Sequence, residues 1–93
     1  MAQRTVIVAS SSGLHARPAK LFVQAAARLG VPVTVRLGEK AVPAKSMLGV
    51  LSLGAVRGTE VTLEADGPGA DEALDSLAAL LARDLDAEEA LDA

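Results

Sequence analysis

The sequence has no cysteine, tryptophan or tyrosine, and it has only one phenylalanine and one histidine among its 93 residues. Without cysteine the chain can form neither a disulfide framework nor a thiolate metal site, and a single histidine excludes a histidine-rich one. The sequence also lacks the nucleotide-binding pattern G-x-x-x-x-G-K. We therefore expect no metal and no cofactor, and a core built from valine, leucine, isoleucine and alanine.

Basic residues are outnumbered by acidic ones, nine to twelve, which gives a net charge of −3. Nucleic-acid binding requires a basic face, so we expect no nucleic-acid partner. No apolar run approaches the roughly 20 residues of a membrane span. The N-terminal residues do not resemble a signal peptide. These features predict a cytoplasmic protein that makes no contact with a membrane.

The length suits one small domain with a single core. We assign residues 1–88 to this domain and residues 89–93 to an acidic tail. The whole segment after Arg83 carries five acidic residues and no basic one. We interpret it as a frayed, solvated end, and an acidic contact surface is the alternative.

Apolar periodicity predicts the element order β-α-β-β-α-β-α. The predicted strands cover residues 4–9, 32–37, 40–44 and 60–65, and the predicted helices cover residues 16–29, 47–53 and 70–85. Alternation in the strands at 32–37 and 60–65 leaves one face polar. We therefore expect an α+β, two-layer open-faced sandwich, in which helices cover one face of a four-stranded antiparallel sheet. Because Pro43 has no N–H to donate, its strand should lie at a sheet edge.

The only histidine, His15, lies in the stretch GLHARP, residues 13–18. Proline is tolerated in the first turn of a helix, so a helix should begin near Ala16 with His15 at or near its N-cap. A helix N-terminus attracts anions, and Arg17 adds a planar set of donors that suits phosphate. The stretch predicts a histidine that can carry a phosphoryl group. A histidine that only caps the helix or lies on the surface is the alternative.

A second stretch, KSMLGVLSLG at residues 45–54, places Ser46 as the N-cap of a short helix. Together with residues 13–18, it resembles the HPr family, the histidine-containing phosphocarrier proteins of the phosphoenolpyruvate-dependent sugar phosphotransferase system. The chain length, the predicted element order and the turn at Gly58 agree with this family. The resemblance covers about residues 1–85.

The resemblance implies that His15 accepts a phosphoryl group, at Nδ1 in this family, from phosphorylated enzyme I and passes it to the IIA unit of a sugar permease. It implies that Arg17 stabilises the phosphate and that Ser12, Ala16 and Pro18 complete the pocket. For Ser12, a plain turn serine is an equal alternative. Such a protein is a phosphorylated carrier with no turnover of its own, not an enzyme. We expect it to be a monomer.

In one branch of the family, an ATP-dependent HPr kinase phosphorylates the serine that matches Ser46. The resemblance thus implies HPr kinase/phosphorylase and a catabolite-control transcription factor as further partners. A phosphate at a helix N-terminus is tolerated by the helix dipole and changes the surface charge. An ordinary N-cap is the alternative, and it is compatible with phosphorylation.

The resemblance also implies a docking patch for enzyme I and the IIA unit beside the histidine. Its expected members are Lys20, Leu21, Lys45, Met47, Leu48 and Leu51. We expect Met47 to be the most exposed of them. The sequence has Gln24 and Ala27 where some relatives carry lysine, and Ala16 where some carry a hydroxyl residue. The basic rim of the patch is therefore thinner than in those relatives.

Two other functions are alternatives. One is a regulatory relative of the same fold that acts through Ser46 and binds a transcription factor, but a purely regulatory protein needs no nucleophile at His15. The other is a small ligand-binding α+β module, which would not need histidine, arginine and proline in this order at a helix start. We therefore predict the phosphocarrier.

Overall fold

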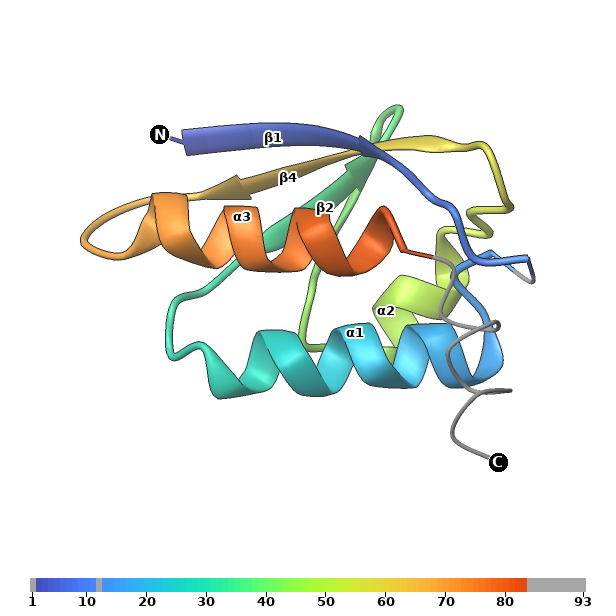
Figure 1. Ribbon diagram of the computed structural model, residues 1–93, viewed down its shortest axis with the longest axis horizontal. Coiled ribbons are helices and arrows are strands. Elements are labelled where there is room, and N and C mark those ends of the chain that lie inside the picture. The colour runs from blue at the N-terminus through green and yellow to red at the C-terminus, as the bar shows by residue number, and fades with distance from the viewer. Residues whose placement is uncertain (1, 12, 84–93) are drawn as a thin grey trace.

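The computed structural model describes residues 2–11 and 13–83 of the chain. The elements in chain order are β1 (Ala2–Ile7), α1 (Ala16–Arg28), β2 (Thr34–Leu37), β3 (Lys40–Pro43), α2 (Met47–Ser52), β4 (Glu60–Ala65) and α3 (Ala70–Leu81). The strands form one antiparallel sheet in the order β1-β4-β2-β3. Figure 1 shows the helices on one side of this sheet, so the predicted open-faced sandwich is confirmed. None of the helices in the described ranges is long and apolar enough to cross a membrane.

Strand alternation separates the two faces of the sheet, as predicted. Val61 and Leu63 of β4 and Val35 of β2 are buried under the helices, where they pack with Phe22 of α1. The open face is polar, and there the carboxylate of Glu64 accepts hydrogen bonds from Gln3 Nε2 at 2.9 Å and Arg36 Nη2 at 3.3 Å. Burying one apolar face and solvating the other is what holds the sheet in its register.

The edge position of β3 confirms the prediction made from Pro43. The predicted first strand was displaced by two residues, because β1 begins at Ala2 and ends at Ile7. Six cross-strand pairs, from Ala2 with Ala65 to Ile7 with Glu60, match β1 to the full length of β4. The other elements lie within one or two residues of their predicted ends, except that α3 ends at Leu81 rather than at residue 85. The predicted boundary at residue 88 lies outside the described residues.

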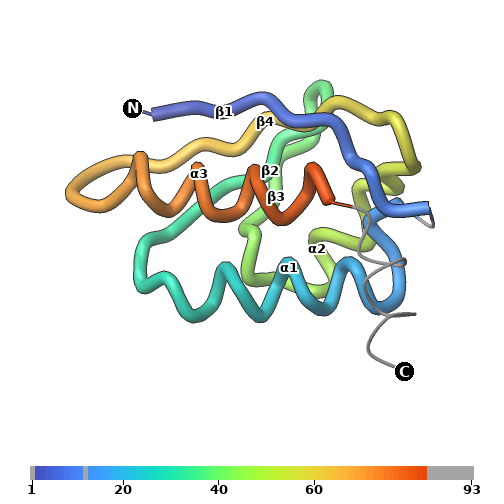
Figure 2. The backbone as a smooth tube through the Cα atoms, viewed as in Figure 1, coloured from blue at the N-terminus to red at the C-terminus, as the bar shows by residue number. Residues whose placement is uncertain are grey.

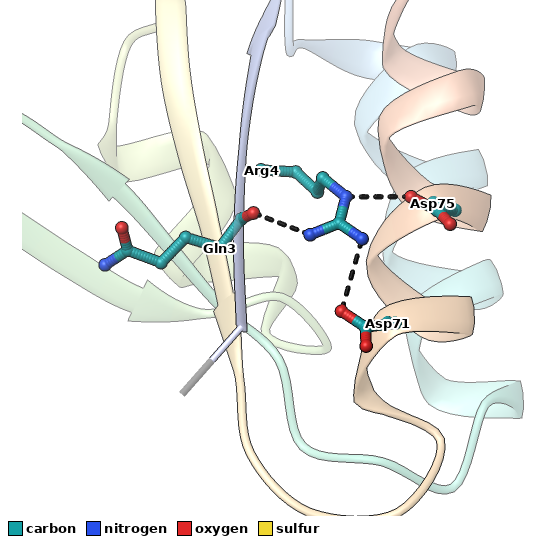
Figure 3. A network of polar contacts seen from close by, with 4 residues as sticks. All are labelled: Gln3, Arg4, Asp71 and Asp75. Carbon is teal, nitrogen blue, oxygen red and sulfur yellow. Dashed lines mark hydrogen bonds and ion pairs between the residues drawn. The ribbon is translucent and has the colours of Figure 1, made fainter.

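A polar network fastens β1 to α3 (Figure 3). Arg4 Nε donates to Asp75 Oδ1 at 2.8 Å, and Arg4 Nη2 lies 3.2 Å from Asp71 Oδ1. Arg4 Nη1 also donates to the carbonyl oxygen of Gln3 at 2.8 Å. The hydrogen bonds that the Arg4 guanidinium donates, first to Asp75 and then to Asp71, raise its pKa above the ordinary value. The network joins the first strand to the last helix, at residues about seventy apart in the sequence.

Several connections meet at the opposite end of α3 (Figure 2). The loop after β1 contacts the segment between α2 and β4, since Leu14 N–H donates to the Ala55 carbonyl at 2.8 Å. The same loop contacts the end of α3, since Ala9 N–H donates to the Leu81 carbonyl at 3.1 Å. The start of α1 is therefore held by two other parts of the chain.

Candidate functional site

His15 is the N-cap of α1, as predicted. Its backbone is extended, with φ −143° and ψ 158°, and the residue is exposed. Its side chain makes no capping hydrogen bond. The imidazole therefore does not perform the capping role, which was one of the two alternatives, and it is accessible to another molecule.

The two residues before His15 anchor the loop. Leu14 is only 2% exposed and belongs to the core. Gly13 has φ +72°, and its N–H donates to the Ser10 carbonyl at 2.8 Å. A Cβ atom at Gly13 would lie 2.4 Å from the carbonyl oxygen of Ala55 and 2.7 Å from Cα of Val56. Only glycine fits this close approach of two backbones.

Ala16, directly after His15, has φ +51°. It is the only non-glycine residue with positive φ in the described part of the chain. The left-handed region costs an L-residue about 1–2 kcal/mol. Backbone strain of this kind persists only where the surroundings enforce it, and it is concentrated at functional sites. The sequence reasoning missed this conformation, because alanine gives no local signal for it.

The beginning of α1 has the features of an anion site. Pro18 lies buried in the first turn, where its missing N–H costs no helical hydrogen bond. The first turn carries no acidic residue, and Arg17 is exposed there. Backbone N–H groups at a helix N-terminus point outward and carry partial positive charge. The structure thus places Ala16, Arg17 and Pro18 together next to His15, whereas Ser12 lies outside the described residues.

Ser46 is the N-cap of α2, which confirms the structural part of its prediction. Its Oγ accepts a hydrogen bond from Gly49 N–H at 3.1 Å. At the other end of this short helix, Lys40 Nζ donates to the carbonyl oxygen of Ser52 at 2.7 Å. A serine side chain and a lysine from the β2–β3 hairpin therefore hold both ends of α2.

One expectation about the docking patch is wrong. Leu48, not Met47, is strongly exposed, at 83%, while Met47 is half-buried against the core. The reason is helical geometry, because Met47 shares a face with Val50 and Leu51, three and four residues along. Val50 is fully buried, so this face of α2 packs inward.

The other expected members of the patch divide by polarity. Lys20 and Lys45 are exposed, whereas Leu21 and Leu51 are half-buried. Val56 is 64% exposed and was not predicted. It follows Ala55, whose carbonyl group holds Leu14, so it belongs to the segment that contacts the histidine loop.

No group of three or more histidine, cysteine, aspartate or glutamate side chains in residues 2–11 and 13–83 could hold a metal ion. The chemistry available at the site is that of one accessible imidazole beside a helix N-terminus and an arginine. Phosphoryl transfer needs positioning and charge stabilisation more than it needs covalent help from the protein. The arrangement suits a histidine that receives and releases a phosphoryl group.

Comparison with known proteins agrees with this chemistry. Residues 2–83 match the family model described as "PTS HPr component phosphorylation site". The chain is 51% identical to the phosphocarrier protein HPr of Streptomyces coelicolor, over 92% of this chain and 94% of that protein. It is 49% identical to the HPr-like protein Crh of Bacillus subtilis, over 85% of this chain and 93% of that protein. The crystal structure of HPr from Bacillus anthracis superposes with a TM-score of 0.83 at 41% identity, covering 86% of this chain and 95% of that one.

Proposed function

The chain belongs to the HPr family, the phosphocarrier proteins of the phosphotransferase system, and on this premise we propose that His15 is its phosphoryl acceptor. Members of this family carry phosphate and are not catalysts. The observation that supports His15 most strongly is that its exposed side chain makes no capping bond at the N-terminus of α1. In this role the protein takes the phosphoryl group from phosphorylated enzyme I and passes it to the IIA unit of a sugar permease.

The transfer has two matching halves. A lone pair on an imidazole nitrogen of His15 attacks the phosphorus atom, and an N–P bond forms while the bond from phosphorus to enzyme I breaks. The second half reverses this, since an acceptor group on the IIA unit attacks and His15 leaves as the free imidazole. The N–H groups of Ala16 and Arg17 and the guanidinium of Arg17 stabilise the phosphoryl oxygens in both halves.

The first residues of α1 are suited to this task for different reasons. Pro18 fixes the start of the helix, and the strained Ala16 turns the chain from the extended His15 into the helix. The Gly13–Ala55 contact holds the loop that presents the ring. Preorganised donors stabilise charge without reorganising during the reaction, which is the main contribution a protein makes to such a step.

We also propose that Ser46 is phosphorylated by an ATP-dependent HPr kinase and that a catabolite-control transcription factor binds the product. Ser46 already caps α2 through its hydroxyl oxygen, so an added phosphate would remain at a helix N-terminus. The dipole tolerates this charge, and the fold is kept while the surface charge changes. Added negative charge would weaken the binding of an acidic partner.

We propose that partners dock through the exposed side chains of Lys20, Lys45 and Leu48, with Val56 added from the structure. An apolar side chain that is 83% exposed contributes nothing to the core of the domain. Small contact areas suit a carrier, because transient complexes bury little surface. We propose that the protein acts as a monomer in the cytoplasm, where it meets enzyme I and the IIA units in turn.

Label transfer tests the proposed relay. The protein would be incubated with radiolabelled phosphoenolpyruvate and catalytic enzyme I, freed of both, and then mixed with a IIA unit. We expect label on this protein first and on the IIA unit afterwards, in equal amount. Label that enters the protein but never leaves it for any IIA unit would contradict the carrier role.

A further inference from the structure

A single peptide group between α2 and β4 supports the histidine loop. This group joins Ala55 to Val56, and its C=O accepts the 2.8 Å hydrogen bond from Leu14 N–H. Its N–H donates to the side-chain oxygen Oγ1 of Thr59 at 3.1 Å. The peptide bond is trans, so these two hydrogen bonds leave the group in opposite directions. Thr59 therefore begins a short hydrogen-bonded chain that ends at Leu14, the residue before His15.

The backbone of Thr59 is fixed to the rest of the domain. Its N–H donates to the carbonyl oxygen of Val56 at 3.0 Å, which closes a turn over residues 56–59. Its carbonyl oxygen accepts a hydrogen bond from Val8 N–H at 2.9 Å, and Gly58 N–H donates to the Val8 carbonyl at 2.8 Å. Val8 is only 1% exposed and belongs to the core. The Thr59 hydroxyl is therefore held in place relative to the core.

The peptide group that this hydroxyl contacts has to keep one orientation. A peptide group can rotate about the single bonds on either side of it, and such a rotation would turn the Ala55 C=O away from Leu14. The side chain of Val56 is 64% exposed, so it gives the group little packing support. The hydrogen bond to Thr59 Oγ1 opposes the rotation. It also polarises the group, which makes the C=O a better acceptor for the Leu14 N–H.

We propose that Thr59 is a positioning residue for His15. Its hydroxyl sets the orientation of the Ala55–Val56 peptide group, and this group holds Leu14, so that the imidazole is presented next to the N–H groups at the start of α1. In this role Thr59 acts through the backbone and does not touch the phosphoryl group. The hold on Leu14 stands on the hydrogen bonds alone, while the effect on transfer rests on the function proposed above.

Three substitutions isolate the hydroxyl of Thr59. Thr59→Val keeps the branched shape and removes the acceptor for Val56 N–H, whereas Thr59→Ser keeps the hydroxyl and loses the methyl group. Thr62→Val is the matched control. Thr62 is half-buried like Thr59 and lies on the open face of β4, and in residues 2–11 and 13–83 its side chain makes no hydrogen bond.

Native-state hydrogen exchange tests the hold on Leu14. The amide of Leu63, in the middle of β4, provides the reference for global unfolding. Thr59→Val should speed exchange at Leu14 about three- to tenfold relative to Leu63, because one hydrogen bond of the chain is lost locally. Thr59→Ser and Thr62→Val should leave this ratio within about twofold of the unaltered chain. If Thr59→Val speeds exchange at both amides equally, or at neither, the hold on Leu14 is overturned.

Phosphoryl acceptance tests the positioning, with two donors. One donor is phosphorylated enzyme I. The other is phosphoramidate, a small molecule that needs no docking surface: an imidazole nitrogen attacks its phosphorus atom, and the donor's own P–N bond breaks as ammonia leaves after protonation. We expect Thr59→Val to be about two- to tenfold slower with both donors, since the ring and the helix N–H groups are misaligned. Thr59→Ser should recover most of the rate, and Thr62→Val should match the unaltered chain.

The two donors separate positioning from docking. An unchanged rate of Thr59→Val with phosphoramidate would overturn the positioning role, even if the rate with enzyme I falls, because the effect would then lie in the contact with the partner. A Thr59→Ser variant as slow as Thr59→Val would overturn it as well. If the unaltered chain takes no phosphate from active enzyme I, the proposed function fails, while the exchange measurement still decides the hold on Leu14.

Discussion

The N–H of Leu14 donates a 2.8 Å hydrogen bond to the carbonyl oxygen of Ala55, and this bond fixes the residue before His15 against the segment between α2 and β4. Gly13 makes the close approach possible, because a side chain there would enter the Ala55 carbonyl. The stretch that contains Ser46 ends next to this contact. The histidine motif thus contacts, through the backbone, the residue that directly follows the second motif.

Substitution of Gly13 tests this contact. Gly13→Ala should lower the free energy of unfolding by about 2–4 kcal/mol, because a positive φ and a backbone clash act together. Phosphoryl acceptance at His15 should slow as the loop moves. Gly30→Ala is the matched control. Gly30 has φ +71°, close to the +72° of Gly13, but there is open space around its Cβ position. Gly30→Ala should lower the free energy of unfolding by only about 1–2 kcal/mol. If urea unfolding shows equal losses for Gly13→Ala and Gly30→Ala, the contact with Ala55 has no role in stability.

Relief of strain at Ala16 gives a prediction of opposite sign. Ala16→Gly should raise the free energy of unfolding by about 0.5–1 kcal/mol, because glycine adopts φ +51° freely while it loses more entropy on folding. Ala27→Gly, at an exposed position within α1, should instead lower it by about 1 kcal/mol. Denaturant titration of both variants decides the matter, and a loss of stability at both positions would argue against strain at Ala16.

Arg17 should contribute to transfer and not to stability. Arg17→Ala should slow phosphoryl acceptance about 10- to 100-fold, since a charge-assisted donor to the phosphoryl group is removed. Arg17→Lys keeps the charge and loses the planar fork, so it should recover only part of the rate. Because Arg17 is exposed, unfolding should change by less than about 0.5 kcal/mol. An unchanged rate in rapid-quench measurements of Arg17→Ala would remove it from the site.

Two substitutions at Ser46 separate its cap from its charge. Ser46→Ala removes the acceptor for Gly49 N–H and should cost about 1 kcal/mol of stability. Ser46→Asp keeps a good capping group, so stability should hold while acceptance from enzyme I slows about three- to tenfold at low salt. Thermal unfolding and transfer rates of both variants would be compared. If Ser46→Asp transfers phosphate as fast as the unaltered chain, Ser46 is a structural cap alone.

Local patterns were sufficient for much of the fold. Alternation identified β2 and β4 within two residues, and Pro43 correctly placed β3 at the sheet edge. His15 and Ser46 were found as N-caps because capping depends on neighbouring residues. Each of these features is determined within a few residues of the chain, which is the range that a sequence pattern describes.

The missed features depend on distant contacts. The limits of β1 follow from its pairing with β4, about sixty residues away, so the β-branched run alone misplaced them. The exposure of Leu48 in place of Met47 follows from which face of α2 packs on the core. The tight space at Gly13 arises where the histidine loop meets Ala55 and Val56, and Ala16, at the end of this loop, has a positive φ. No residue near them in the sequence signals these constraints.

The most direct test of the central claim is the mass of the intact protein after incubation with phosphoenolpyruvate and catalytic enzyme I. The account predicts a gain of one phosphate that brief acid treatment removes, as for a phosphoryl group on imidazole nitrogen. His15→Ala should show no gain while it keeps the unfolding midpoint of the unaltered chain, because His15 is exposed and its side chain makes no capping bond. An acid-labile phosphate on His15→Ala, or none on the unaltered chain with active enzyme I, would contradict the account.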